Sequence, residues 1–507
     1  MKDSVTTESE QPAYASLKPM KKSGLYDPAF EHDACGVGLV ANIRGDRSHQ
    51  MVDQALDVLN HLTHRGARGA DPNTGDGAGL LIQIPHDFFS GVAADLNIKL
   101  PEPGRYGIAM VFLPQGDEAR AKCEAEIETA VKAQGLKLLG WRDVPQRPNE
   151  IGILAQKVKP TIRQAFISGI SEIDSDKLER ELYVARKVVE NAVDAMTDIL
   201  SDDDRDTFYI CSMSARTIVY KGLLISEQVA PFFPDLQDER LNTAFALVHS
   251  RYSTNTLGAW KLAHPYRMLC HNGEINTVQG NKNWMRARER HFTSDLFGDD
   301  VRKLTPITQQ DESDTASFDQ VFELLNLGGR EIEHVAAMMI PEPWYGHETM
   351  SEERKAFYQY HSSVMEPWDG PAMMAFTDGH KVGAVLDRNG FRPMRYLVTK
   401  DDLLVMASET GVLDIAPEDV AYKGRLQPGM IFLVDFDEGR IIDDAEIKHG
   451  LAARAPYSEW IKENARFLAD MPEPAFVPGL DRATLEVRQK AFGYSQEDLR
   501  ILLPPLG

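Results

Sequence analysis

The sequence contains few cysteines, and none of them has the spacing of a metal centre. Its 507 residues include four cysteines, which are Cys35, Cys123, Cys211 and Cys270. Zinc sites and iron–sulfur clusters need cysteines paired at spacings such as Cys-x-x-Cys, and no such pair is present. Scattered cysteines in a long chain are typical of a reducing compartment. The sequence therefore predicts no metal site and a cytoplasmic location.

Basic charge and long apolar runs are also scarce. The chain carries 55 Lys and Arg against 77 Asp and Glu, a formal net charge of -22. Nucleic acids and anionic membranes are bound by clustered Lys and Arg, so we expect neither as a partner. No stretch has the ~20 apolar residues that a membrane-spanning helix needs. The Gly-x-x-x-x-Gly-Lys-Ser/Thr pattern of a phosphate loop is absent as well.

The first 34 residues are polar and contain no apolar core after their lysines, so they do not form a secretory signal. One interpretation is a disordered tail. The other is a leader that is removed to make Cys35 the first residue. A free α-amino group, with a pKa near ~8, would then lie beside a thiol with a pKa near ~8.5 and could take its proton. Without cleavage, the simplest expectation for Cys35 is an inert buried thiol.

Apolar periodicity predicts strands near both ends of the chain and helices between them. Strand patterns occur at 37–43, 80–84, 106–113, 207–220, 244–248 and 266–270, and again at five places between 373 and 434. This order predicts an α+β fold with layers built on a mostly antiparallel sheet. From about residue 455 the pattern becomes helical, at 457–469 and 482–502, which indicates the start of a second domain.

Polar residues follow two of these predicted strands, where sheets often build sites. The strand 244–248 leads into Arg251, and the strand 266–270 leads into Asn272 and Gly273. A further helix begins near Asp314. With Cys35 these groups match the needs of amide hydrolysis, which are a nucleophile, an oxyanion hole and groups that recognise the substrate. Taken one at a time, they could equally be a surface ion-pair partner, a hairpin turn and a helix cap.

Several motifs in this order resemble the class II glutamine amidotransferases, whose nucleophile is N-terminal, and are most similar to the amidotransferase region of glutamate synthase large subunits. The motifs that carry the resemblance are Cys35-Gly36-Val37-Gly38, His64-Arg65-Gly66-Ala67, Gly75-Asp76-Gly77-Ala78-Gly79, His249-Ser250-Arg251-Tyr252-Ser253-Thr254-Asn255-Thr256, His271-Asn272-Gly273-Glu274-Ile275-Asn276-Thr277, Ser313-Asp314-Thr315 and Asp387-Arg388-Asn389-Gly390-Phe391-Arg392-Pro393.

The resemblance implies a four-layer αββα fold of N-terminal-nucleophile hydrolases, with Cys35 exposed by removal of the leader. It implies that Cys35 attacks the side-chain carbonyl of glutamine, forms a γ-glutamyl thioester and releases ammonia. The side-chain amide of Asn272 and the N–H of Gly273 would hold the oxyanion.

The resemblance also implies three substrate-binding residues. Arg251 would pair with the α-carboxylate of glutamine through two parallel hydrogen bonds. Asp314 would hold the α-ammonium group, and Arg65 would belong to a loop that closes over the bound substrate. His264 and His271 are expected to be structural, because the α-amine already supplies a base.

The expected domains are a leader at 1–34, the amidotransferase domain at 35–460, and a linker with the truncated start of a second, α/β central domain at 461–507. Glutamate synthase large subunits continue into a synthase domain with FMN and an iron–sulfur cluster, where ammonia and 2-oxoglutarate yield glutamate, and they work with an electron-donating subunit. This chain would supply the glutamine-hydrolysing half without a cofactor, as a fragment or as a separate subunit. An amidotransferase with another acceptor, or an unprocessed glutamine-binding module without catalysis, is the alternative.

Overall fold

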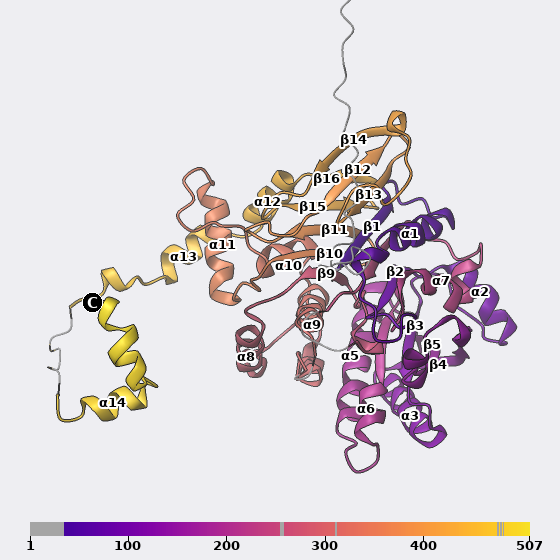
Figure 1. Cartoon of the computed structure of the whole chain (residues 1–507), viewed down its shortest axis with the longest axis horizontal. Coiled ribbons are helices and arrows are strands. Elements are labelled where there is room, and N and C mark those ends of the chain that lie inside the picture. Colours follow the sequence, from indigo (N-terminus) through magenta and orange to yellow (C-terminus); the bar gives the residue numbers. More distant parts are fainter. Residues whose placement is uncertain are drawn as a thin grey trace, which may run out of the picture. The chain divides into compact units, whose positions relative to one another are not determined.

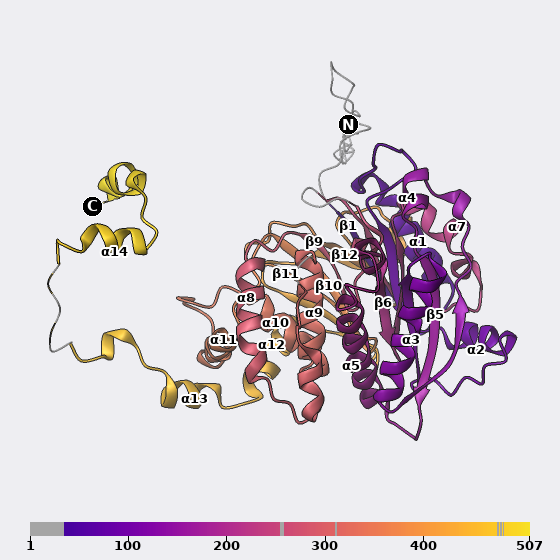
Figure 2. The ribbon, with the colours of Figure 1, turned by 90° about the horizontal axis from the view of Figure 1, so that it is seen from below.

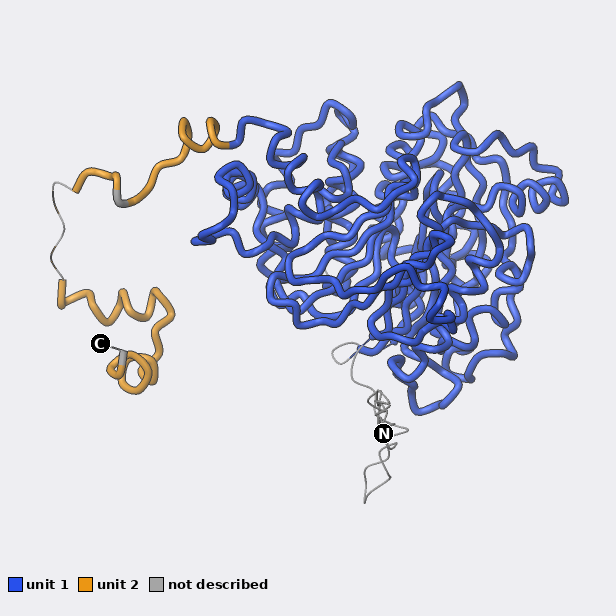
Figure 3. Tube along the Cα trace, turned by 90° about the horizontal axis from the view of Figure 1, so that it is seen from above, with its two compact units in different colours: residues 1–457 blue, residues 458–507 orange. Residues whose placement is uncertain are grey.

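The computed structural model describes residues 35–253, 258–309, 312–473, 476, 479 and 481–506. The predicted leader at 1–34 lies outside the described residues, and so does the run 254–256 of one of the motifs. The chain divides into two compact units, Met1–Tyr457 and Ser458–Gly507 (Figure 3). All the predicted site residues belong to the first unit.

Three antiparallel sheets build the first unit. The seven-stranded sheet has the order β14-β12-β13-β1-β8-β2-β7, the five-stranded sheet β16-β15-β11-β10-β9, and the four-stranded sheet β4-β5-β3-β6. The strands are β1 (Gly36–Asn42), β2 (Ala78–Gln83), β3 (Tyr106–Leu113), β4 (Leu136–Asp143), β5 (Thr161–Gly169), β6 (Tyr209–Ser214), β7 (Thr217–Gly222), β8 (Phe245–Ser250), β9 (Leu269–Gly273), β10 (Ala372–Thr377), β11 (Lys381–Leu386), β12 (Arg395–Thr399), β13 (Leu403–Ala407), β14 (Val420–Arg425), β15 (Ile431–Asp435) and β16 (Arg440–Ile442).

Helices cover the outer faces of the two larger sheets, which gives four layers (Figure 1). On one side α1 packs on β1 and β8, and on the other side α9 and α10 pack on β9, β11 and β15. The helices are α1 (Gln50–His61), α2 (His86–Asp95), α3 (Asp117–Ala133), α4 (Ile153–Lys157), α5 (Ser175–Asp194), α6 (Asp202–Thr207), α7 (Val229–Phe232), α8 (Val278–Arg288), α9 (Asp314–Leu327), α10 (Ile332–Met339), α11 (Glu352–Val364), α12 (Asp444–Ala453), α13 (Tyr457–Asn464) and α14 (Leu485–Ala491).

The main core lies between the two larger sheets. Leu39 of β1 and Leu247 of β8 share one buried apolar cluster with Cys270 of β9 and Met373 of β10. Because side chains alternate along a strand, the residues two positions on from these also face the space between the sheets. The predicted α+β fold with its layered antiparallel sheets is confirmed.

The four-stranded sheet extends the stack of the two larger sheets. Its strands were predicted only in part. Its strands β3 and β6 fall within predicted strand patterns, whereas β4 and β5 were missed. The pairing of β4 with β5 shifts its register between Leu138 and Gly140, so the alternation of apolar residues is broken at that point. Helices α3 and α5 pack on each other, and both share a second apolar cluster with this sheet (Figure 2).

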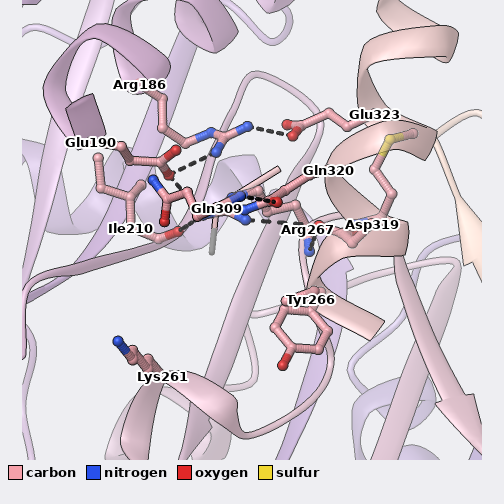
Figure 4. A network of polar contacts seen from close by, with 12 residues as sticks. Arg186, Glu190, Ile210, Lys261, Tyr266, Arg267, Gln309, Asp319, Gln320 and Glu323 are labelled. Carbon is pink, nitrogen blue, oxygen red and sulfur yellow. Dashed lines mark hydrogen bonds and ion pairs between the residues drawn. The ribbon is translucent and has the colours of Figure 1, made fainter. Parts of the chain in front are cut away.

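A buried network of ion pairs joins α5, which packs on the four-stranded sheet, to α9, which packs on the five-stranded sheet (Figure 4). Arg186 donates to Glu190 at 2.7 Å and also pairs with Glu323, while Arg267 donates to Glu190 at 2.8 Å. Burial alone would raise the pKa of Glu190, but the two guanidinium charges outweigh it and lower that pKa to about 2. The carboxylate of Asp319 accepts from the backbone N–H groups that lead into β9. The network therefore anchors the start of β9.

One strand boundary differs from the sequence prediction. We predicted a strand that ends at Cys270, with polar residues after it, but β9 runs from Leu269 to Gly273. Its pairing with β10 extends to the pair formed by Gly273 and Ala372. Asn272 and Gly273 are thus part of an edge strand, which fixes their directions more firmly than a turn would.

None of the described helices has the length and apolar character required to cross a membrane. Within the same residues, no group of three or more His, Cys, Asp and Glu side chains is arranged to hold a metal ion.

Candidate active site

A cavity of about 420 Å³ lies where the ends of β1, β8 and β9 meet the N-terminus of α9. Its wall includes Cys35, Arg251, Gly273 and Asp314. These four residues come from separate parts of the sequence and are all among the six predicted site residues. The tertiary structure therefore gathers most of the predicted set around one space.

Cys35 immediately precedes β1, and the pairing of Gly36 with Ser250 places it beside the end of β8. Its thiol donates to the carbonyl oxygen of Tyr252 at 3.1 Å and accepts from the N–H of Tyr252 at 3.3 Å. Burial raises the pKa of the Cys35 thiol, although the charge of Arg251 opposes this effect. The sulfur is therefore protonated at neutral pH and needs a nearby base to become a nucleophile.

Asn272 points into the space between the two sheets, toward β1. Its Nδ2 donates to the Ser408 hydroxyl at 3.4 Å, and that hydroxyl accepts from the N–H of Val37 at 3.1 Å. The N–H of Ser408 in turn donates to the carbonyl of Val37 at 2.9 Å. An amide group carries two hydrogens, of which Ser408 accepts one; Asn272 itself is buried and is not part of the cavity wall.

Gly273 offers a backbone N–H beside that side chain. The N–H and carbonyl of its partner Ala372 bond to Asp387, so they point away from β9. Gly273 and Ala372 therefore form a non-hydrogen-bonded antiparallel pair, in which the backbone groups of each residue point away from the other strand. Because β9 is the edge strand of its sheet, the N–H of Gly273 points away from the sheet. The φ of Gly273 is +140°, and an added Cβ would lie 1.8 Å from the Pro371 carbonyl oxygen. Only glycine fits this position.

Arg251 is held by two of the sequence motifs, His64-Arg65-Gly66-Ala67 and Gly75-Asp76-Gly77-Ala78-Gly79. Its N–H donates to the Gly77 carbonyl at 2.8 Å, and its own carbonyl accepts from Ala67 at 3.0 Å. Its Nη1 donates to the carbonyl of Asp76 at 3.3 Å and lies 3.6 Å from the carboxylate of that residue. The guanidinium is thus a buried cation at the cavity wall, suited to a carboxylate.

Asp314 is the first residue of α9 and connects this helix to the end of β9. One carboxylate oxygen accepts from the N–H of Ile275 at 2.8 Å and the other from Thr315 at 2.7 Å. The second of these oxygens also accepts from the Thr315 hydroxyl at 3.2 Å, so the oxygen that faces Ile275 is the one that keeps a lone pair for a cation. Glu312 also lines the cavity, and its Oε2 has no hydrogen-bond partner among the described residues. Glu312 was not predicted from the sequence, and it offers a second carboxylate to an ammonium group.

Arg65 lies beside β1, because a Cβ on Gly36 would meet the Arg65 Cβ at 3.4 Å. Its guanidinium pairs with Glu409 at 2.5 Å, and Arg65 is not part of the cavity wall. Ser408 and Glu409 are functional candidates that the sequence analysis missed. They directly follow the buried strand β13. A polar residue directly after a buried strand is also the feature from which Arg251 was predicted.

The three histidines near the cavity are packed as neutral rings. His249 and His264 stack with their ring centres 4.1 Å apart, and His271 Nδ1 lies 2.8 Å from the Thr315 hydroxyl. Burial lowers the pKa of His249 to about 3, lowers that of His264 well below its usual value and lowers that of His271 too. Such rings support the walls and do not exchange protons near neutral pH.

Comparisons with known proteins identify the family to which this chain is similar. A family model described as glutamine amidotransferases class-II matches residues 35–460. The chain is 50% identical over 487 residues to the glutamate synthase (NADPH) large chain of Bacillus subtilis strain 168, with 96% of this chain and 31% of that protein covered.

Two further relatives show the same partial coverage. The glutamate synthase (NADPH) large chain of Azospirillum brasilense is 40% identical over 497 residues, which are 97% of this chain and 32% of that protein. The glutamate synthase (NADH) of Schizosaccharomyces pombe is 41% identical over 512 residues, 98% of this chain and 24% of that protein. This chain spans less than a third of the length of each relative.

Proposed function

Because this chain belongs to the class II glutamine amidotransferases, we propose that it hydrolyses the side-chain amide of L-glutamine with Cys35 as the nucleophile. The observation that carries the proposal is the convergence of a thiol, an edge-strand N–H, a buried arginine and two acids on one cavity. A thiol and paired oxyanion donors serve acyl transfer, and the charged residues fit the α-carboxylate and α-ammonium of an amino acid.

In the proposed reaction the Cys35 sulfur attacks the amide carbon of glutamine. The negative charge that develops on the carbonyl oxygen is held by Asn272 Nδ2 and the Gly273 N–H. The tetrahedral intermediate collapses to a γ-glutamyl thioester as the C–N bond breaks and the nitrogen leaves as ammonia after taking up a proton. Water then attacks the thioester and releases glutamate and the free thiol.

In the same proposal Arg251 binds the α-carboxylate, and Asp314 binds the α-ammonium with Glu312 beside it. Arg65 closes over the substrate only after it exchanges Glu409 for another partner. Removal of residues 1–34 supplies the α-amine of Cys35 as the base that the raised pKa of its thiol requires.

Mass spectrometry of the intact protein tests this proposal directly. We expect the mass to lack residues 1–34 and to gain one adduct after treatment with a glutamine-analogue alkylating agent. L-Glutamine should protect against the adduct, and Cys35→Ala should not form it, while Cys123, Cys211 and Cys270 are buried and should not react. A full-length mass without an adduct would contradict the proposal and would favour the non-catalytic module.

A second prediction concerns pH. With the α-amine as base, kcat/KM should rise about tenfold per pH unit up to the amine pKa of ~8, because only the unprotonated amine accepts the thiol proton. Burial lowers the pKa of His271, so its ring is already neutral throughout this range. His271→Asn keeps a group able to bond Thr315, and we expect it to leave the midpoint unchanged. A midpoint that disappears in this variant would make His271 the base.

We propose further that the ammonia serves glutamate synthesis from 2-oxoglutarate in a cytoplasmic glutamate synthase. The proposed partners are the remaining part of a large subunit and an electron-donating subunit. The support is the identity of 40–50% to such proteins over nearly all of this chain. Delivery of ammonia to another acceptor is the alternative, and an acceptor screen with purified partners distinguishes the two.

FMN and an iron–sulfur cluster are implied for a glutamate synthase. Three of the four cysteines are buried singly, and the described residues hold no group of metal-ligating side chains. The residues present therefore do not fit an iron–sulfur cluster. We propose that both cofactors belong to a separate synthase domain, and that residues 35–460 form the amidotransferase domain with the start of another domain at 461–507.

A further inference from the structure

A second cavity, of about 390 Å³, lies at the opposite end of the seven-stranded sheet. Turns after β1, β2 and β10 and the turn before β7 contribute to its wall. β1 runs seven residues from this cavity to Gly36, so roughly 20 Å of strand separates it from Cys35. Its charged and titratable wall residues are Arg44, Arg47, His86, Tyr106, Arg216, His380 and Asp437.

The charge of this wall is opposite to that of the chain. The whole chain has a formal charge of -22, yet three arginines and two histidines line the cavity with a single carboxylate, Asp437. Arg44 pairs with Asp402 and Arg216 with Asp176, and both of these carboxylates lie outside the wall. Such a concentration of cations in a concave space attracts anions.

Arg47 is the cation of this wall without an acidic partner. Its Nη1 donates to the carbonyl of Ile84 at 3.1 Å, and no carboxylate among the described residues lies within ion-pair distance of it. Burial lowers the pKa of Arg47, and the charge of Asp87, which lies beyond ion-pair distance, offsets this effect only in part. An anion in the cavity would supply a closer counter-charge.

Arg216 has a hydrogen-bond donor, its Nε–H, for which no acceptor is seen among the described residues. Its Nη2 bonds to Asp176 at 2.5 Å, whereas its Nε is buried and has no hydrogen-bond partner within the described part of the chain. Buried donors are nearly always satisfied, so an orphan of this kind points to a missing acceptor. Gly45 and Gly379 border the same space with φ values of +81° and +91°, a backbone conformation that favours glycine.

We propose that this cavity binds a phosphate group, either as the free ion or as part of a small phosphorylated metabolite, with Arg47 and Arg216 as its main ligands. Guanidinium groups match phosphate oxygens with parallel hydrogen bonds, and phosphate offers acceptors to both arginines at once. A volume of about 390 Å³ lies in the range of small-molecule sites and exceeds what a single phosphate ion fills. The site is independent of the proposed glutamine chemistry.

Isothermal titration calorimetry at constant ionic strength tests this assignment. The titrants are inorganic phosphate, glycerol phosphate, and glycerol as a control without a phosphate group. We expect both phosphates and not glycerol to bind the unmodified chain. Tighter binding of glycerol phosphate identifies a metabolite site, whereas equal binding identifies a site for the free ion.

Variants locate the binding. Arg47→Ala and Arg216→Gln should each weaken phosphate binding about tenfold or more, as expected for the loss of a charged hydrogen-bond donor. Arg302→Ala removes the same charge from an exposed position away from the cavity and should bind like the unmodified chain. The proposal is wrong if no phosphate binds above the salt control, or if all three variants lose affinity equally.

Discussion

Asn272→Ala should lower the kcat of glutamine hydrolysis by about 10²–10³-fold, which corresponds to ~3–4 kcal/mol of lost transition-state stabilisation. The reason is geometric. Asn272 faces the space between the sheets, and Ser408 holds one of its two amide hydrogens. The remaining hydrogen donates to an oxygen that becomes charged only during the reaction. Because substrate binding rests on other residues, KM should change little.

The measurement is steady-state glutaminase kinetics together with a thermal unfolding curve. Asn272→Asp keeps the shape of the side chain but cannot donate, so it should be as slow as the alanine variant. Asn60→Ala, on an exposed part of α1, serves as a matched control and should retain full turnover. Near-normal turnover of Asn272→Ala with an intact fold would remove Asn272 from the oxyanion hole.

Arg186→Met should cost about 3–5 kcal/mol of the free energy of unfolding, because it removes the ion-pair partner of the buried carboxylate of Glu323. The side chain of Arg186 is 1% exposed and bonds to both Glu190 and Glu323. The same network holds the residues that lead into β9. We therefore expect the midpoint of urea unfolding to fall and the glutaminase activity to fall with it.

Two further variants distinguish the stability lost with the ion pair from the stability lost with side-chain packing. The double variant Arg186→Met with Glu323→Leu removes both charges and should recover part of the lost stability, since apolar pairs often replace buried ion pairs without cost. Arg440→Met breaks an exposed pair with Glu446 and should leave the unfolding midpoint unchanged. A single variant Arg186→Met that unfolds at the normal midpoint would show that the network contributes nothing to stability.

The site could be predicted as a set of residues but not as a geometry. Cys35, Arg251 and Asp314 were found because each stands at the edge of an apolar pattern, next to a strand or at a helix start. Ser408 and Glu409 stand in the same kind of position after β13 and were overlooked, since no motif of known chemistry marks them. Glu312 was not predicted, because acidic residues before a helix are common. Its position at the cavity wall is what makes it a candidate substrate-binding residue.

The amino-acid sequence by itself determined the α+β class, most of the strands of the two larger sheets, and the chemical types available to the site. These follow from local periodicity and from residues that suit one backbone conformation, such as the glycine at position 273. Only the tertiary structure decided that β9 is an edge strand whose N–H points outward, that Arg65 pairs with Glu409, and that Arg186 and Glu323 meet. The physical reason is that these contacts join residues far apart in the sequence, and pairing at such separation is set by how whole sheets and helices pack.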